Sequence, residues 1–191
     1  DLNKVAAFFV ESFQGWGAVF YPTDYIVAMR EWSTANDCLL VFDEIQAGFG
    51  RTGKLFAYEH YDVEPDLVVC GKGISGSVPL AAVLGSKELI ECDSAYTSTH
   101  GGNPLACAAG LGNLEAFENL DLVKESKRKG KIMLDIIHSW KDKYPSRIGN
   151  ILGNGLLYGV FITKENSNEL DSELTNYICE LAMEKGVFSI C

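Results

Sequence analysis

Two residues of opposite charge, Asp43 and Lys72, each follow an apolar run that is typical of a buried β-strand. Asp43 comes directly after Cys38–Phe42 (CLLVF), and Lys72 comes one glycine after Leu67–Cys70 (LVVC). Lys72 follows Asp43 by 29 positions, which is about the length of a β-α-β unit. If the two strands are neighbours in one parallel sheet, both side chains emerge at its carboxyl edge, where open α/β sheets bind ligands.

A carboxylate and a lysine placed in this way can hold pyridoxal phosphate. The lysine amine forms a Schiff base with the aldehyde of that cofactor, and the carboxylate pairs with its protonated pyridine nitrogen. Gly71 and Gly73 flank Lys72 and would let the backbone approach a bound cofactor closely. The alternatives are ordinary: a lysine after a strand is commonly a solvated loop residue, and an aspartate there commonly caps a helix.

Three glycine patterns raise other nucleotide-binding functions, and each pattern is incomplete. Gly48–Lys54 matches GxxxxGK, but Leu55 stands where a P-loop needs Ser or Thr for magnesium. The same glycines match GxGxxG, but no strand runs directly into them. A second GxGxxG follows a strand but has a lysine inside it and no helix after it; its glycines are Gly71, Gly73 and Gly76. An ATPase and a dinucleotide-binding dehydrogenase are therefore disfavoured.

The spacing of apolar residues predicts an α/β fold. Four runs are apolar on both faces, which suits strands covered by helices on each side of a sheet. These runs are Val5–Val10, Cys38–Phe42, Leu67–Cys70 and Leu80–Leu84. Only nine residues lie between Cys70 and Leu80, too few for a parallel crossover. We therefore expect a mostly parallel sheet with one antiparallel strand.

Helical spacing and end signals predict the remaining elements. The expected helices are Pro22–Asn36, one that starts at Asn103-Pro104, Asp121–Lys143 and Asp171–Lys185, and one more strand is expected at Leu156–Thr163. Residues 1–125 are expected to form part of a large cofactor-binding domain. Residues 126–191 are expected to supply a linking helix and part of a small α+β C-terminal domain. The absence of an initiator Met, and a strand expected to begin at Val187–Cys191, indicate a fragment of a longer chain.

The composition argues against several classes of function. The 191 residues carry a formal net charge of −10, which disfavours nucleic acid or an anionic membrane as the main partner. No apolar run reaches about 18 residues, so no membrane-spanning segment is expected. Six cysteines without a CxxC pair indicate free thiols in the cytoplasm, with an organelle matrix as the alternative. The three histidines show no ligand spacing, so no metal site is expected.

Three segments carry a resemblance to a known family: Glu11–Gly17, then VFDEIQAGFGRTGKLFAYEHYDVEPDLVVCGKGISGSVPLAAV, then STHGGNPLACAA. Together and in this order they resemble the class III pyridoxal-phosphate-dependent aminotransferases, which include ornithine, acetylornithine, 4-aminobutyrate and other ω-amino transaminases. The resemblance is dense over residues 5–118 and looser to the end. It implies the fold type I of pyridoxal-phosphate enzymes and a transaminase that moves an amino group from an amine or amino acid donor to a 2-oxo acid.

The resemblance also implies roles for individual residues around the cofactor. Lys72 is implied to form the Schiff base, and Asp43 to pair with the protonated pyridine nitrogen. Ile45 is implied to pack on one face of the ring, and Gln46 to reach the 3′ oxygen. No metal ligand is implied.

Two further implied roles lie toward the partner subunit and the substrate. Thr99 resembles the threonine that hydrogen-bonds the phosphate of the neighbouring subunit's cofactor, so a homodimer with shared active sites is implied. Glu11 resembles an acidic residue that, in some members, pairs with a substrate-binding arginine near the chain's end. The chain departs from the family pattern on the substrate side, where Ser12 replaces a proline, Ala18 a glycine and His100 a Phe or Tyr.

Two parts of the family's site are expected outside this sequence: the phosphate-cradling helix start before residue 1 and the carboxylate-binding arginine beyond Cys191. Activity is therefore expected only in a full-length chain. The alternative from a different class is a truncated or degenerate noncatalytic homologue that serves as a binding or assembly partner.

Overall fold

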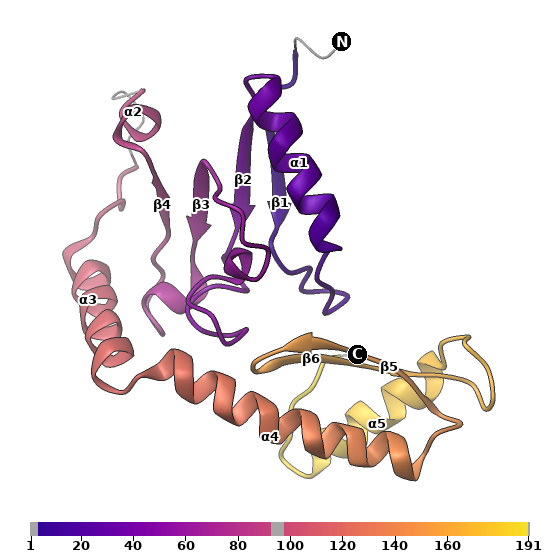
Figure 1. The fold of residues 1–191 in the computed structure, drawn as a ribbon. Helices are drawn as coiled ribbons and strands as arrows, with labels where there is room; N and C mark the ends of the chain where they lie inside the picture. The colour runs from indigo at the N-terminus through magenta and orange to yellow at the C-terminus, as the bar shows by residue number, and fades with distance from the viewer. Residues whose placement is uncertain (1–3, 93–97, 191) are drawn as a thin grey trace.

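The computed structural model describes residues 4–92 and 98–190 and contains a four-stranded sheet in the order β1-β2-β3-β4 (Figure 1). Its strands are β1 (Ala7–Glu11), β2 (Leu39–Asp43), β3 (Leu67–Cys70) and β4 (Ala82–Gly85). β1, β2 and β3 are parallel, and β4 is antiparallel to β3. The prediction of a mostly parallel sheet with one reversed strand is confirmed.

Helix α1 (Thr23–Ala35) connects β1 to β2 and covers one face of the sheet (Figure 1). Its Ile26 and Met29 pack in one cluster with Leu40 and Phe42 of β2. Ile26, Leu40 and Phe42 have no exposed surface, and burying a side chain of this size contributes about 1.5–3 kcal/mol. This packing fixes β2, and β2 ends at Asp43.

Three helices follow β4: α2 (Lys87–Ile90), α3 (Pro104–Asn119) and α4 (Leu122–Lys143). The predicted start of α3 is confirmed, because Asn103 Oδ1 accepts from Leu105 N at 2.9 Å and Pro104 is the first helical residue. The long helix α4 extends away from α3 and leads to the second sheet (Figure 1).

The second sheet is an antiparallel pair, β5 (Ile148–Asn154) and β6 (Leu157–Ile162), followed by helix α5 (Ser172–Glu184). The sequence predicts β6 and α5 but misses β5, because Gly149, Gly153 and two asparagines interrupt its pattern and are depleted from strands. β5 forms because a two-residue turn, in which Gly155 has a φ of 59°, pairs it directly with β6.

One expected strand is not found. Residues 187–190 have no regular structure, and Cys191 lies outside the described residues. Apolar, β-favouring residues form a strand only where a neighbouring strand satisfies their backbone, and none pairs with these residues in the described part of the chain. The division into residues 1–125 and 126–191 remains a prediction, with α4 running across it.

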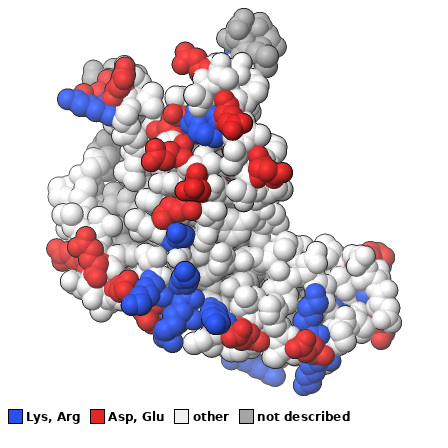
Figure 2. Space-filling view, viewed as in Figure 1, with Lys and Arg blue, Asp and Glu red and all other residues white. Residues whose placement is uncertain are grey.

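Charged side chains are unevenly spread over the surface in Figure 2. On the face shown, most Lys and Arg side chains lie over α4, while many acidic side chains lie over the four-stranded sheet and α1. None of the helices in the described part of the chain has the length and apolar character needed to cross a bilayer.

Candidate active site

The three parallel strands end side by side, at Glu11, Asp43 and Cys70. Glu11 is the register partner of Asp43, and Asp43 is the partner of Val69. Adjacent strands lie about 4.8 Å apart, so Asp43 is next to the end of β3, and Lys72 follows that end by two residues. The structure therefore brings Asp43 and Lys72 to the same carboxyl edge, as the sequence predicts.

The carboxylate of Asp43 is half-buried and partly anchored. Its Oδ1 accepts from the backbone N–H of Ile45 at 2.9 Å, which orients the group. Its Oδ2 has no hydrogen-bond or ion-pair partner among residues 4–92 and 98–190. One oxygen is thus available to a group that needs a negative partner.

Glu44, beside Asp43, is fully buried and serves the fold. Its two carboxylate oxygens accept from the backbone N–H groups of Ala57 (2.9 Å) and Tyr58 (2.8 Å). Burial raises the pKa of this carboxyl, and the two N–H donors act in the opposite direction. Glu44 therefore ties the segment that contains Ala57 and Tyr58 to the end of β2, beside Asp43.

Lys72 opens a single-turn 3-10 helix, Lys72–Ile74, and its backbone is strained. Its φ is 37°, a left-handed value that costs a non-glycine residue about 1–3 kcal/mol. The side chain is exposed, and within the described part of the chain Nζ has no hydrogen bond and no ion pair. Strain of this kind persists where the surroundings hold it, and it clusters at functional sites.

The glycines on either side of Lys72 are there because other side chains occupy the space. A Cβ at Gly71 would lie 3.1 Å from Ile45, and one at Gly73 would lie 2.8 Å from Phe49 Cβ. Ile45 and Phe49 both belong to the segment after Asp43. The Lys72 turn is therefore packed directly on that segment.

Gln46 and Glu11 both lie beside Gly15, which follows β1. A Cβ at Gly15 would lie 2.9 Å from Nε2 of Gln46, so a larger residue there would displace the Gln46 amide from its present position. Glu11 Oε2 accepts from the backbone N–H of Gly15 at 3.2 Å. Glu11, Gln46 and Asp43 thus lie at one edge, which agrees with the expected location of the site.

Thr99 has no polar contact with the predicted site residues within the described part of the chain. It lies in an exposed turn before α3, and no hydrogen bond or ion pair between described residues joins it to Lys72, Asp43 or Gln46. Its expected role concerns a neighbouring subunit's cofactor and stays a prediction.

Sequence patterns do not single out Asn113, a residue of α3. Its Nδ2 donates to the carbonyl oxygens of Gly73 (2.7 Å) and Ile74 (3.2 Å), in the turn that carries Lys72. An asparagine in the middle of a helix of small and apolar residues is the signal that could have drawn attention to it.

Burial raises the pKa of the nearby Cys70 thiol to about 11, so this cysteine is not a nucleophile for the site.

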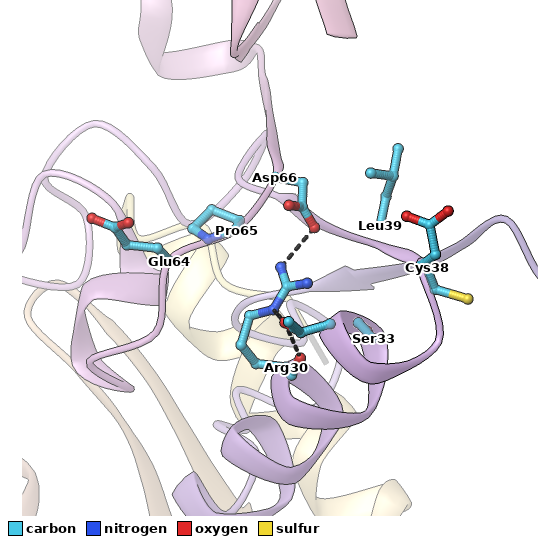
Figure 3. A pocket seen from close by; sticks show the side chains of 9 residues that line it. Arg30, Ser33, Cys38, Leu39, Glu64, Pro65 and Asp66 are labelled. Carbon is cyan, nitrogen blue, oxygen red and sulfur yellow. Dashed lines mark hydrogen bonds and ion pairs between the residues drawn. The ribbon is translucent and has the colours of Figure 1, made fainter. Parts of the chain in front are cut away.

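A cavity of about 370 Å³ lies at the opposite edge of the sheet, where β2 and β3 begin (Figure 3). Arg30 of α1 points toward Asp66, and Nη1 and Oδ2 are 2.6 Å apart. Asp66 Oδ2 also accepts from Leu40 N at 2.7 Å. These bonds tie α1 to β2 and β3, which is a structural role far from Lys72.

The donor set at the carboxyl edge fits pyridoxal phosphate. Among the described residues, the amine of Lys72 and the Oδ2 of Asp43 have no partner, and two glycines remove side chains beside the lysine. No group of three or more metal-ligating side chains occurs among the described residues.

The whole chain matches one family model, and its relatives carry related names. The model is "Aminotransferase class-III" and matches residues 1–191. The acetylornithine aminotransferase of Synechocystis sp. is 42% identical over 97% of this chain, and the 4-aminobutyrate aminotransferase of Mycobacterium leprae is 35% identical over 97%. The chain spans about 42% of the length of each.

Solved structures agree with this match. The taurine:2-oxoglutarate aminotransferase of Bifidobacterium kashiwanohense, solved with PLP and glutamate, superposes with a TM-score of 0.87 at 29% identity, over 96% of this chain and 44% of that one. The expected α/β architecture of fold type I is confirmed. The chain belongs to the class-III aminotransferase family.

Proposed function

We propose that the full-length protein is a pyridoxal-phosphate-dependent transaminase that moves an amino group from an amine or amino acid to a 2-oxo acid. The observation that carries the proposal is the pair Asp43 and Lys72, which emerge beside each other from a parallel sheet in a chain of the class-III family. The names of the relatives, acetylornithine and 4-aminobutyrate aminotransferase, favour donors with an amino group distant from a carboxylate.

When bound, pyridoxal phosphate supplies an electron sink for the carbon that loses or gains the amino group. Lys72 would hold the cofactor through its Nζ, and the same amine, once free, would be the group at this edge that moves a proton at the reacting carbon.

Asp43 would hold a proton on the pyridine nitrogen through Oδ2, which has no partner among the described residues. Ile45 would pack against the ring, and its position between Asp43 and Gly71 supports this role. Gln46 would donate its amide to the 3′ oxygen, and the space that Gly15 leaves beside that amide supports this role. Glu11 contributes on the substrate side.

We further propose a homodimer in which Thr99 serves the partner's site. Thr99 is exposed, and no hydrogen bond or ion pair between described residues joins it to Lys72 of its own chain, which supports this assignment. These 191 residues carry a charge of −10, which opposes association, so the part of the interface that they form must be locally apolar. The helix after Thr99, α3, exposes Leu105, Leu111 and Leu114. A cytoplasmic location is the accompanying expectation from the cysteine pattern.

The test is amino-group transfer by the full-length protein from a panel of amines and amino acids to a 2-oxo acid. We expect turnover by the wild type, none by Lys72→Ala, and wild-type turnover by Lys87→Ala, which removes an exposed lysine of α2. A folded wild type that binds no pyridoxal phosphate and transfers no amino group would support the noncatalytic alternative instead.

A further inference from the structure

Helix α3 sends one polar side chain to the turn that carries Lys72. Asn113 Nδ2 donates to the carbonyl oxygens of Gly73 at 2.7 Å and Ile74 at 3.2 Å. Because both partners can only accept, the amide nitrogen must face the turn, and the partners settle the orientation of the amide. These bonds join residues about 40 positions apart in the chain.

The turn needs such support, because Lys72 has a φ of 37°. Gly71 and Gly73 are packed on Ile45 and Phe49 from one side, as described above. Asn113 approaches from α3, and a Cβ at Gly76, whose φ is 73°, would lie 3.2 Å from its Oδ1. A strained residue keeps its conformation only when its surroundings determine it from several directions.

We propose that Asn113 is a positioning residue for Lys72. By holding the carbonyl groups of Gly73 and Ile74, it keeps the backbone of Lys72 left-handed and its Nζ at the carboxyl edge of β3. This inference rests on the proposed function and deepens it, because it adds a residue of α3 that acts on the site through the turn carrying Lys72.

The first experiment tests, without cofactor, whether Asn113 keeps the backbone of Lys72 in its strained conformation. Lys72→Gly relieves the strain, because glycine adopts a positive φ at no steric cost. In the cofactor-free full-length protein, we compare the change in melting temperature caused by Lys72→Gly in two proteins, one with Asn113 and one with Asn113→Ala. The change should be more favourable, by about 2 °C or more, in the protein that keeps Asn113. The control variant is Asn119→Ala, at an exposed position of the same helix. Lys72→Gly should change the melting temperature by the same amount with and without Asn119→Ala.

The second experiment measures the consequence for the cofactor by titrating the full-length protein with pyridoxal phosphate and following visible absorbance. Asn113→Ala should weaken binding about twofold to tenfold, the range expected for one net hydrogen bond. Asn113→Asp keeps the shape of the side chain but offers no donor when ionised, so it should weaken binding at least as much. Asn119→Ala and Asn119→Asp should bind as the wild type.

The outcomes separate the possibilities. Additive melting temperatures in both backgrounds would overturn the hold of Asn113 on Lys72. Coupling in the first experiment with unchanged cofactor affinity in the second would make Asn113 merely structural, which also overturns the proposal. If the wild type takes up no pyridoxal phosphate, the proposed function fails, while the melting temperatures still decide whether Asn113 holds Lys72.

Discussion

The two carboxylate oxygens of Asp43 have different surroundings. Oδ1 accepts from Ile45 N, whereas Oδ2 has no partner among the described residues. In Asp43→Asn the amide oxygen can still accept that bond, so the full-length variant should fold and hold cofactor. A neutral amide does not keep a proton on the pyridine nitrogen, so the first half-reaction should slow about 100-fold or more. Single-turnover absorbance gives the rate, with the exposed Asp142→Asn as control. A near-wild-type rate would contradict the electronic role.

Glu44 predicts a slope of stability with pH. Burial raises the pKa of its carboxyl above the ordinary 4.5. The folded protein therefore holds this proton more tightly than the unfolded chain. As a result, the free energy of unfolding falls as pH rises from 4.5 through the raised pKa and is level above it. Thermal unfolding of full-length Glu44→Gln should lack this part of the slope.

The same variant should also be less stable at neutral pH. Glutamine has one oxygen for the two N–H groups of Ala57 and Tyr58, and leaving a buried donor unpaired costs about 1–3 kcal/mol. Glu115→Gln, at an exposed position of α3, should keep both the stability and the slope of the wild type. An unchanged slope in Glu44→Gln would show that Glu44 does not titrate in this window.

At the residue level, the sequence predicts Asp43 and Lys72 because each follows a recognisable strand. It does not predict the positive φ of Lys72, the room that Gly15 leaves for Gln46, or the bonds from Asn113. These features depend on contacts between residues about 30–40 positions apart, and a local pattern does not contain such contacts. The roles of Ile45, Gln46, Thr99 and Glu11 stay predictions.

At the level of elements, a close three-way contact joins the loop after β2 to α4 and to the β5–β6 turn. Leu156 N donates to Arg51 O at 2.7 Å, and a Cβ at Gly155 would lie 2.6 Å from Gly53 N. A Cβ at Gly130 of α4 would lie 2.7 Å from Gly155 Cα. The loop that follows Asp43 is therefore packed closely against the turn of the second sheet.

Gly130→Ala tests this packing. Alanine in a helix interior is ordinarily more stable than glycine by about 1 kcal/mol. Here the added methyl meets the Gly155 backbone, and overpacking of that kind costs about 1–3 kcal/mol. We expect chemical denaturation of the full-length variant to show no stabilisation and a loss of up to about 2 kcal/mol. His138→Ala, an exposed position of α4, should be neutral or slightly stabilising. A gain for Gly130→Ala would mean that the contact is loose.

The elements themselves were largely predictable. All four strands of the larger sheet and the long helices match their apolar patterns, and β4 is reversed because its connection is short. The pattern of β5 is hidden because Gly149 and Gly153 interrupt it. The strand expected at Val187–Cys191 is not found at residues 187–190, because no strand pairs with them in the described chain. Pairing partners, which local patterns do not reveal, decide both cases.

At the scale of the whole molecule, the shared-site homodimer can be tested by mixing two inactive full-length variants, Lys72→Ala and Thr99→Ala, under conditions that exchange subunits. In a mixed dimer one site carries both lesions and the other carries neither, so activity should rise toward about a quarter of wild type. Unmixed samples that undergo the same exchange are the control. If mixing restores nothing although Thr99→Ala weakens cofactor binding, Thr99 serves its own chain.

The central claim is that the full-length protein binds pyridoxal phosphate through Lys72. The direct measurement is borohydride reduction of the cofactor-loaded protein, followed by proteolysis and mass spectrometry of the labelled peptide. We expect one reduced cofactor per chain, attached to the peptide that contains Lys72, and loss of the label in Lys72→Ala but not in Lys87→Ala. A label on another lysine, or none in a folded wild-type protein, would contradict it.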